Sequence, residues 1–198
     1  MKKSTLSSIL ETKTNSDHRL IRDFNTLDST VKRLKKKGLK IVLTQGVWDL
    51  IHEGHARYLE AAKAYGDILV VGLDSDALTR LRKGPNRPIV PEKERIEMLT
   101  HLRHVDIVTV RDIHHDIGHL IRLVKPDVLI TSSSTADFKD DLKAGKYDEF
   151  CGSVVTLPPQ ATTHTSARIR NLTIEGAEKL ADEVAKLTHD FIQKIRTV

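Results

Sequence analysis

Two histidines with a glycine between them stand where an apolar run gives way to a helix. His52 and His55 are three positions apart, Gly54 lies between them, and Ile41–Leu43 is the apolar run upstream. Residues three apart share one face of a helix, so both imidazoles could donate to the same phosphate. The first N–H groups of a helix are unpaired and its dipole is positive there, which favours an anion. Gly54 lets a planar base or a ribose approach the backbone. The alternative is a helix start that carries two histidines by chance.

The composition favours an anionic partner without naming it. The chain has 198 residues, a net charge of +5, 39% hydrophobic residues and 30% charged residues. Phosphorylated small molecules and nucleic acid both fit that charge. Aromatic residues make up only 4% of the chain, and no aromatic stripe suited to single strands is visible. Nucleic acid is therefore not the expected partner, although the basic run at 32–37 leaves a nucleic-acid-binding protein as an alternative.

Cysteine content and hydropathy indicate a cytoplasmic setting. Cys151 is the single cysteine, so no internal disulfide can form. The chain begins with basic residues but has no apolar run of signal-peptide length. It also lacks an apolar stretch of about 18 residues, so we expect no membrane partner.

Alternating apolar runs and helical patterns predict the fold. The expected strands are 41–43, 68–73, 106–110, 128–131 and 154–157, and the helices between them lie near 53–65, 75–82, 91–102, 115–124 and 136–144. This order is typical of an α/β protein, with a Rossmann-like, doubly wound, five-stranded parallel sheet and helices on both faces. Ligands of such sheets bind beyond the carboxyl ends of the strands, at the switch point.

Three segments are expected along the chain. Residues 1–38 form an N-terminal arm and a helix near 26–37, residues 39–172 form the central domain, and residues 173–198 form an amphipathic C-terminal helix. That last helix could pack on its own domain or pair with another subunit, and the second alternative is compatible with a homodimer.

The segment from the first strand to the helix resembles a known signature. It reads Thr44-Gln45-Gly46-Val47-Trp48-Asp49-Leu50-Ile51-His52-Glu53-Gly54-His55. It is similar to the T-x-G-x-F-D-x-x-H-x-G-H signature of the cytidylyltransferase-like nucleotidyltransferase family. Within the family it most resembles the adenylyltransferase domains of ADP-heptose synthases, and more distantly the glycerol-3-phosphate cytidylyltransferases. The likeness runs from about residue 27 to residue 172 and includes Asp74-Ser75-Asp76, Lys83-Gly84, Arg87-Pro88 and Glu94-Arg95.

The resemblance implies nucleotidyl transfer. In that reaction a phosphate of the acceptor attacks the α-phosphorus of a nucleoside triphosphate, and pyrophosphate leaves. We expect AMP transfer from ATP, with CMP transfer from CTP as the alternative, to a phosphorylated sugar or polyol. Mg²⁺ would be carried by the triphosphate, and no metal site of the protein is expected. A non-catalytic nucleotide-binding or regulatory module of the same fold is the alternative function.

The resemblance also assigns roles to individual residues. Catalytic roles fall to His52, His55, Lys83 and Arg95, with Arg95 on the leaving phosphates or on the acceptor phosphate. Nucleotide contacts fall to Thr44, Gln45, Gly46, Val47, Trp48, Gly54, Thr165 and Ser166. Acceptor contacts fall to Asp49, Ser132 and Ser133.

Each role has a structural alternative. Asp49 could cap the helix, and Lys83 could be a solvated loop lysine. Arg95 could pair with Glu92 or Glu97 on the helix surface. Thr165 and Ser166 could serve only as a helix N-cap. A further histidine cluster, made of His114, His115 and His119, could grip a metal but lacks a third ligand at a suitable spacing.

The chain departs from the family pattern at three places. Gln45 replaces an asparagine common in the heptose branch, and Trp48 stands where phenylalanine is usual. Trp48 adds volume and an N–H donor. The segment 131–137 lacks the glycines that family members often carry after the fourth strand. These departures leave the identity of the acceptor open.

Overall fold

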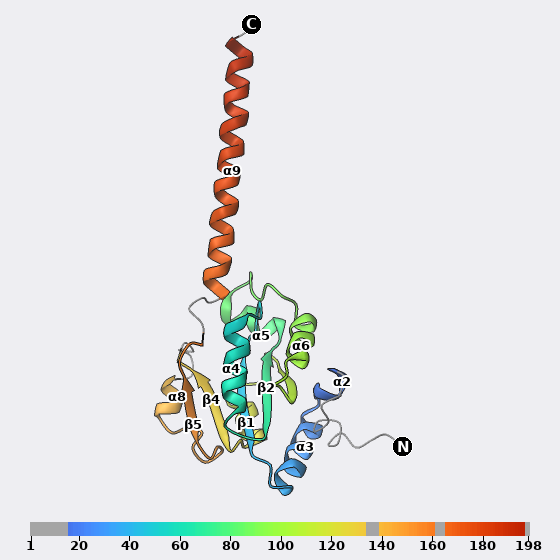
Figure 1. Ribbon diagram of the computed structural model, residues 1–198. Coiled ribbons are helices and arrows are strands. Elements are labelled where there is room, and N and C mark those ends of the chain that lie inside the picture. Colours follow the sequence, from blue (N-terminus) through green and yellow to red (C-terminus); the bar gives the residue numbers. More distant parts are fainter. Residues whose placement is uncertain (1–15, 134–138, 161–164, 197–198) are drawn as a thin grey trace. The chain divides into compact units, whose positions relative to one another are not determined.

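The computed structural model describes residues 16–133, 139–160 and 165–196. The chain divides into two compact units, Met1–Ala161 and Thr162–Val198, and each is described by itself. The first unit contains α2 (Ser16–Arg19), α3 (Phe24–Lys36), β1 (Ile41–Gly46), α4 (Glu53–Lys63), β2 (Ile68–Asp74), α5 (Asp76–Lys83), α6 (Glu92–His101), β3 (Ile107–Arg111), α7 (His119–Val124), β4 (Val128–Ser132), α8 (Lys139–Lys143) and β5 (Val154–Leu157) (Figure 1). The second contains one helix, α9 (Thr165–Arg196).

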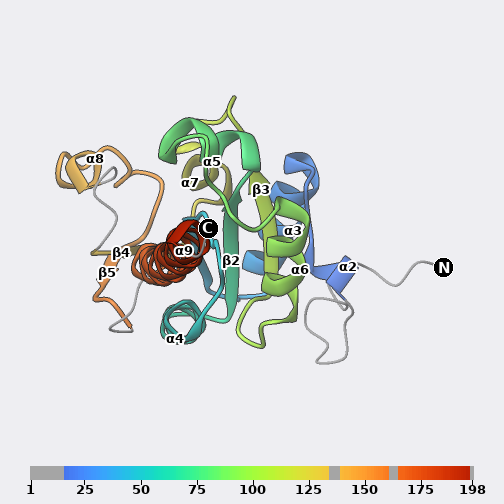
Figure 2. The same ribbon diagram turned by 90° about the horizontal axis from the view of Figure 1, so that it is seen from above.

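The five strands form one parallel sheet in the order β3-β2-β1-β4-β5. Figure 2 shows β4 and β5 on one side of β2 and β3 on the other. Along the chain, β2 pairs with one side of β1 and β3 then pairs with β2. The next strand, β4, pairs with the other side of β1. The strand order therefore reverses between β1 and β4, which makes the carboxyl ends of these two strands the switch point of the fold.

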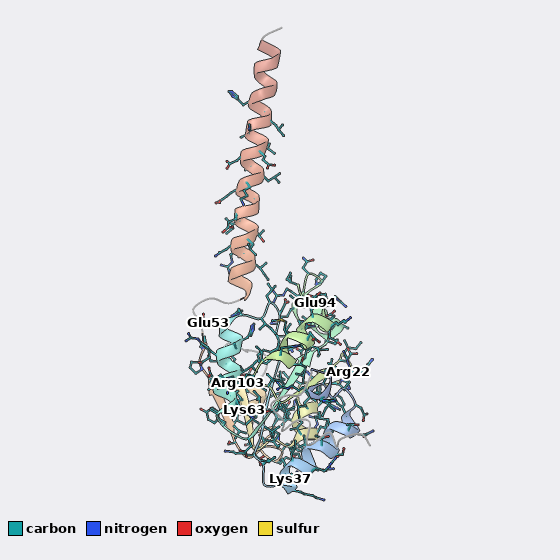
Figure 3. The ribbon with its side chains drawn as sticks, turned by 45° about the vertical axis from the view of Figure 1, so that its right-hand side comes forward. Arg22, Lys37, Glu53, Lys63, Glu94 and Arg103 are labelled. Carbon is teal, nitrogen blue, oxygen red and sulfur yellow. The ribbon has the colours of Figure 1, made fainter. Side chains whose placement is uncertain are left out.

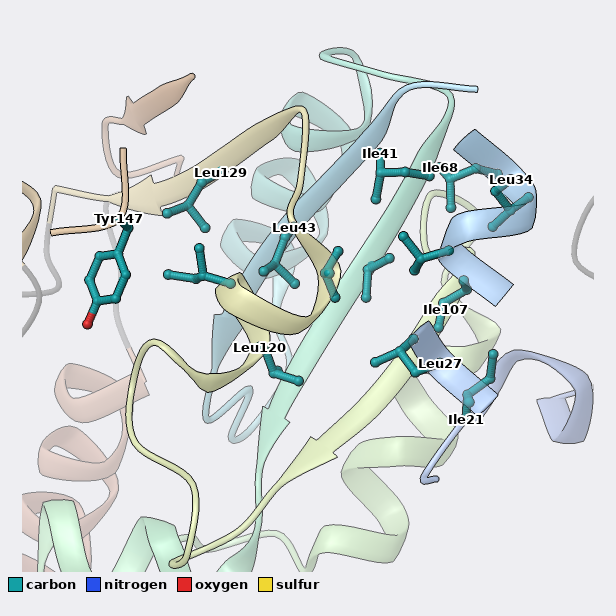
Figure 4. Packing of buried hydrophobic residues seen from close by; sticks show 14 residues of the cluster. Ile21, Leu27, Leu34, Ile41, Leu43, Ile68, Ile107, Leu120, Leu129 and Tyr147 are labelled. Carbon is teal, nitrogen blue, oxygen red and sulfur yellow. The ribbon is translucent and has the colours of Figure 1, made fainter. Parts of the chain in front are cut away.

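Alternate residues of the strands point to opposite faces of the sheet, and their side chains pack in two separate hydrophobic cores, one on each face. Ile41 and Leu43 of β1 join the core that contains Leu27 of α3 and Leu120 of α7 (Figure 4). Val42, between them, joins the second core, to which α4 and α6 contribute Leu59, Ala62, Ile96 and Leu99. Strands buried on both faces explain the continuous apolar runs in the sequence.

The segment before β1 is part of the first unit. Leu27, Val31 and Leu34 of α3 are buried in the core. Just upstream, Ile21 N–H donates to the Val108 carbonyl at 2.9 Å, which covers the outer edge of β3. The described residues from Ile21 to Leu34 thus pack on the first unit, and the predicted division at residue 38 stays a prediction. At Val108 this segment occupies the outer edge of β3, where another chain could otherwise pair.

The predicted strands are confirmed and two predicted helix boundaries are wrong. All five strands occur within three residues of their expected bounds, and β5 matches them at both ends. The helix expected near 115–124 begins only at His119. The break expected between a helix at 165–171 and a tail helix at 173–198 does not occur, because α9 runs without interruption from Thr165 to Arg196. No helix among the described residues is both long enough and apolar enough to cross a membrane.

Candidate functional site

The amino end of α4 carries both signature histidines, and they cap the helix together. His52 is the N-cap, and its Nδ1 accepts the Gly54 N–H at 3.0 Å. His55 returns the contact, since its Nδ1 accepts the His52 N–H at 3.4 Å. Two orphan N–H groups of the helix are thus satisfied by imidazoles, in the way that serine and glutamate form a capping box. The two rings lie 4.2 Å apart between centroids.

The capping bonds determine which nitrogen of each neutral ring carries the proton. A neutral imidazole has one N–H and one acceptor nitrogen, and the acceptor is Nδ1 in both rings. In the neutral form of each ring the proton is therefore on Nε2. A pair of Nε2–H donors at a helix amino end, where the dipole is positive, is suited to a phosphate rather than to a metal ion. Figure 3 labels Glu53, which begins α4 beside this pair.

The turn that delivers the histidines has an unusual backbone. Trp48 and Leu50 have φ angles of 55° and 45°, in the left-handed region. Such a conformation costs an L-residue about 1–2 kcal/mol, so the surroundings must hold it in place. Trp48 is 6% exposed and its Nε1–H donates to the Gly72 carbonyl of β2 at 3.1 Å. Trp48 therefore lies in the core, with its ring 5.6 Å from that of His55 between centroids, and the nucleotide contact assigned to this residue stays a prediction.

Asp49 ties the turn to the loop that follows α5. Its carboxylate accepts the N–H groups of Ile89 and Val90, each at 2.9 Å, and pairs with Arg87 Nη2 at 3.0 Å. The residue is 3% exposed. Neither of the two predictions for Asp49, acceptor contact or helix cap, describes this arrangement. The Asp49 carboxylate binds groups of the protein itself, and the N-cap of α4 is His52.

Arg95 is enclosed rather than presented to a ligand. The residue is 1% exposed. Its guanidinium donates to the carbonyls of Val47, Val90 and Asp74 and to the Asp76 carboxylate, the last at 2.6 Å. The phosphate contact of Arg95 stays a prediction, whereas the alternative of a surface pair with Glu92 or Glu97 is wrong, because the residue is buried and pairs with Asp76. Arg95 joins the turn after β1, the end of β2 and the start of α5.

The predicted residues at the end of β1 have partners within the fold. Thr44 is buried, and its Oγ1 shares a hydrogen bond of 3.0 Å with the Tyr58 hydroxyl of α4. Burial raises the pKa of Tyr58 to about 12, so this hydroxyl stays protonated. Gln45 Nε2 donates to the Ile117 carbonyl at 2.7 Å, while its Oε1 is buried without a hydrogen-bond partner. Gly46 ends β1, and Val47 is the first residue of the turn after it.

The remaining predicted residues lie on several elements. Ser132 ends β4, next to the end of β1, and Ser133 follows it, so the structure brings both to the switch point. Lys83 is exposed at the last position of α5, before Gly84 with φ 94°. The loop after it returns to Asp49. Thr165 and Ser166 begin α9 in the second unit, and their side chains lie outside what the structure describes, so their nucleotide contacts stay predictions.

A buried ion cluster beside the turn was missed by the sequence reasoning. Asp74 is fully buried, and its carboxylate accepts from Arg111 Nη2 at 2.6 Å and from Arg82. Asp74 and Arg111 end β2 and β3 in register. The sequence did contain a signal for this cluster, because Asp74 and Arg111 carry opposite charges at the ends of two apolar strands. The cluster holds the carboxyl ends of β2 and β3 together next to the site.

The second histidine group forms an aromatic cluster instead of a metal site. The rings of His115 and His119 lie 4.6 Å apart, and the Phe24 ring of α3 lies 4.8 Å from His115 and 5.0 Å from His119. His115 Nδ1 accepts the Asp112 N–H at 2.9 Å. In the part of the chain that the structure describes, no group of three or more His, Cys, Asp or Glu side chains is placed to hold a metal.

This cluster makes the stability of the protein depend on pH. Burial, and then the nearby His115, lower the pKa of His119 from its ordinary 6.5. Between the two values the unfolded chain binds more protons than the folded one, so stability falls as the pH drops below about 6.5. We expect His119→Gln to flatten the fall in the free energy of unfolding between about pH 7 and pH 5.5. Urea denaturation at several pH values measures it, with the exposed His101→Gln as control. Equal slopes in the wild type and in His119→Gln would contradict this account.

Comparison with known proteins identifies the family. The model of the cytidylyltransferase-like family matches residues 43–171, from β1 into α9. The chain belongs to the cytidylyltransferase-like family. The match contains the capped histidine pair, the Asp49 and Arg95 contacts and the whole sheet apart from the first two residues of β1.

The similar proteins include bifunctional proteins and enzymes of related fold. The bifunctional protein HldE of Desulfatibacillum aliphaticivorans is 38% identical over 150 residues, which cover 75% of this chain and 30% of that protein. HldE of Aliarcobacter butzleri is 33% identical over 83% of this chain and 33% of its own length. The chain thus spans about a third of these relatives.

Two solved structures share the fold. The lipopolysaccharide core biosynthesis protein of Thermoplasma volcanium is 27% identical with a TM-score of 0.55, over 62% of this chain and 98% of that one. A pantoate-beta-alanine ligase from Francisella tularensis shares the fold alone, at 18% identity and a TM-score of 0.54, over 82% of this chain and 77% of that one.

Proposed function

We propose that this protein transfers a nucleoside monophosphate, AMP in preference to CMP, from a nucleoside triphosphate to a phosphorylated sugar or polyol. The observation that carries the proposal is the capped histidine pair. His52 and His55 are held as Nε2–H donors at the amino end of α4, beside the switch point of a cytidylyltransferase-like domain. Similarity to HldE proteins supports the sugar-phosphate acceptor.

In the proposed reaction an oxygen of the acceptor phosphate attacks the α-phosphorus of the triphosphate. The new P–O bond forms as the bond between the α-phosphorus and the bridging oxygen breaks, and pyrophosphate leaves with that oxygen. The two Nε2–H groups donate to phosphate oxygens and stabilise the charge that builds up in transfer. Lys83, on the exposed end of α5, supplies a cation for the leaving phosphates. Such a reaction needs positioning and charge neutralisation more than covalent help.

The residues present fit a divalent cation brought by the nucleotide better than one bound by the protein. The carboxylates nearest the turn are engaged by arginines, namely Asp49 by Arg87, Asp74 by Arg111, and Asp76 by Arg95. Carboxylates paired in this way are poor direct ligands for Mg²⁺. When bound, the cation would neutralise charge on the phosphates, and the protein's part is to bind and orient those phosphates.

Pyrophosphate release tests the proposal. The protein is incubated with Mg²⁺, each nucleoside triphosphate in turn, and a panel of sugar and polyol phosphates. We expect release with ATP and one sugar phosphate, and loss of release with His55→Ala. Nucleotide binding by calorimetry without release from any pair would favour the non-catalytic module instead.

A further inference from the structure

We propose that α9 pairs with the same helix of a second copy of this chain, in a parallel two-stranded coiled coil. The proposal concerns the second unit and does not rest on the proposed function. The sequence leaves two alternatives for this helix, packing on its own domain or pairing with another subunit, and the pattern of α9 supports the second.

A seam of apolar and small side chains runs along α9 with the spacing of a heptad repeat. Its six positions follow one another at intervals of four, three, four, three and four residues: Thr173, Ala177, Leu180, Val184, Leu187 and Phe191. An alternation of three and four is the spacing by which one helix meets another in a coiled coil. Leu180, Val184 and Leu187 are 62%, 53% and 70% exposed. A helix gains most of its stability from the packing of its apolar side, so this seam calls for a helical partner.

The residue types in the seam specify two strands that run in parallel. In the heptad, Val184 takes the first core position, a, and Leu180 and Leu187 take the second core position, d. A β-branched residue at a with leucine at d favours a parallel dimer over three or four strands. Each seam residue then packs against its own counterpart, so Val184 meets the partner subunit's Val184. A second copy of this chain is therefore the partner that the seam fits.

The charges beside the seam oppose an antiparallel pair. Glu183 and Asp190 border the seam on one side, at position g of the heptad, whereas Ala181 and Thr188 border it on the other side, at position e. Antiparallel helices place g beside g, so the acidic residues of one helix would face those of the other, which is unfavourable. Parallel helices place g beside e, so Glu183 faces the partner subunit's Thr188 instead of another acid. The charge pattern thus agrees with the direction that the core residues indicate.

Disulfide trapping tests both the pairing and its direction. Cys151 is the only cysteine of the chain, so Cys151→Ser gives a background in which each introduced thiol reports alone. In that background we expect Thr173→Cys and Leu187→Cys each to form a disulfide-linked dimer on oxidation, because parallel pairing brings each position within reach of its counterpart. Lys186→Cys, at position c on the outer side of the helix, is the control and should cross-link about tenfold more slowly.

The two seam positions together report the direction. They lie fourteen residues apart in the sequence, so an antiparallel pair can join at most one of them to its counterpart. Cross-linking at only one of the two would overturn the parallel arrangement, and equal rates at all three cysteines would overturn the seam.

Sedimentation equilibrium of the unmodified chain tests the association itself. We expect a concentration-dependent species of twice 22.3 kDa. Leu187→Lys should raise its dissociation constant about a hundredfold, because pairing would then bury two unpaired charges. Lys186→Ala should leave the constant unchanged, and an unchanged thermal midpoint of the first unit in Leu187→Lys shows that the chain still folds. A chain that is monomeric at every concentration, with the seam packed on its own domain, would contradict the proposal, as would a dimer that survives Leu187→Lys.

Discussion

His55→Ala is expected to lower kcat for nucleotidyl transfer about 10²- to 10³-fold, the usual loss when one donor to a developing charge is removed. The reason is geometric. His55 holds its Nε2–H beside that of His52, at the positive end of α4. Steady-state pyrophosphate release measures the loss, and KM for the triphosphate should rise much less than kcat falls.

The control separates chemistry from helix capping. Asparagine is a good N-cap, so His52→Asn should keep the bond to the Gly54 N–H and the thermal midpoint, yet lose about as much kcat as His55→Ala. A variant His52→Asn with near wild-type turnover would show that the histidine acts only as a cap, and the alternative of a helix start without catalytic role would be correct.

Arg95→Met is expected to lower the free energy of unfolding by about 3 kcal/mol. This is the lower end of the usual cost of breaking a buried ion pair, because the Asp76 side chain is 28% exposed. The Arg95 side chain is fully buried, with its charge on Asp76 at 2.6 Å and on three carbonyls. Methionine fills similar space but satisfies none of these acceptors. Urea denaturation at pH 7 measures the change.

Arg57→Met is the matched control. Arg57 forms an exposed pair with Glu53 one turn away on α4, with side chains 62% and 63% exposed. Such a pair contributes less than about 1 kcal/mol, so the control should unfold near the wild-type midpoint. If Arg95→Met behaved like this control and instead raised KM for the triphosphate, Arg95 would be a phosphate ligand, as the family resemblance implies.

The sheet could be predicted from the sequence because its strands are apolar on both faces. Ile41–Leu43 and 68–73 have no polar residue to confuse the pattern, and each is followed by a helical period. The start of α4 could be predicted for a similar reason, since His52, Gly54 and His55 are adjacent in sequence and their relation is local.

The contacts of Arg95 and Asp49 could not be predicted from the sequence in this way. Arg95 and Asp49 have the residue types of ligands for phosphate and sugar, but each has partners far along the chain. Val47 lies 48 positions from Arg95, and Ile89 and Val90 lie 40 and 41 positions from Asp49. Whether a charged side chain faces a substrate or the interior depends on how the loops close, and spacing along the chain does not report that. The left-handed conformation of Trp48, which buries the indole, was hidden for the same reason.

The measurement that tests the central claim most directly follows the phosphorus atoms. The protein is given ATP labelled with ³²P at the α or at the γ position, with Mg²⁺ and the sugar phosphate that supports pyrophosphate release. The account predicts that the α label enters the acceptor product and the γ label leaves in pyrophosphate. Transfer of the γ label to the acceptor, or bound ATP with no transfer of either label, would contradict nucleotidyl transfer at the His52–His55 pair.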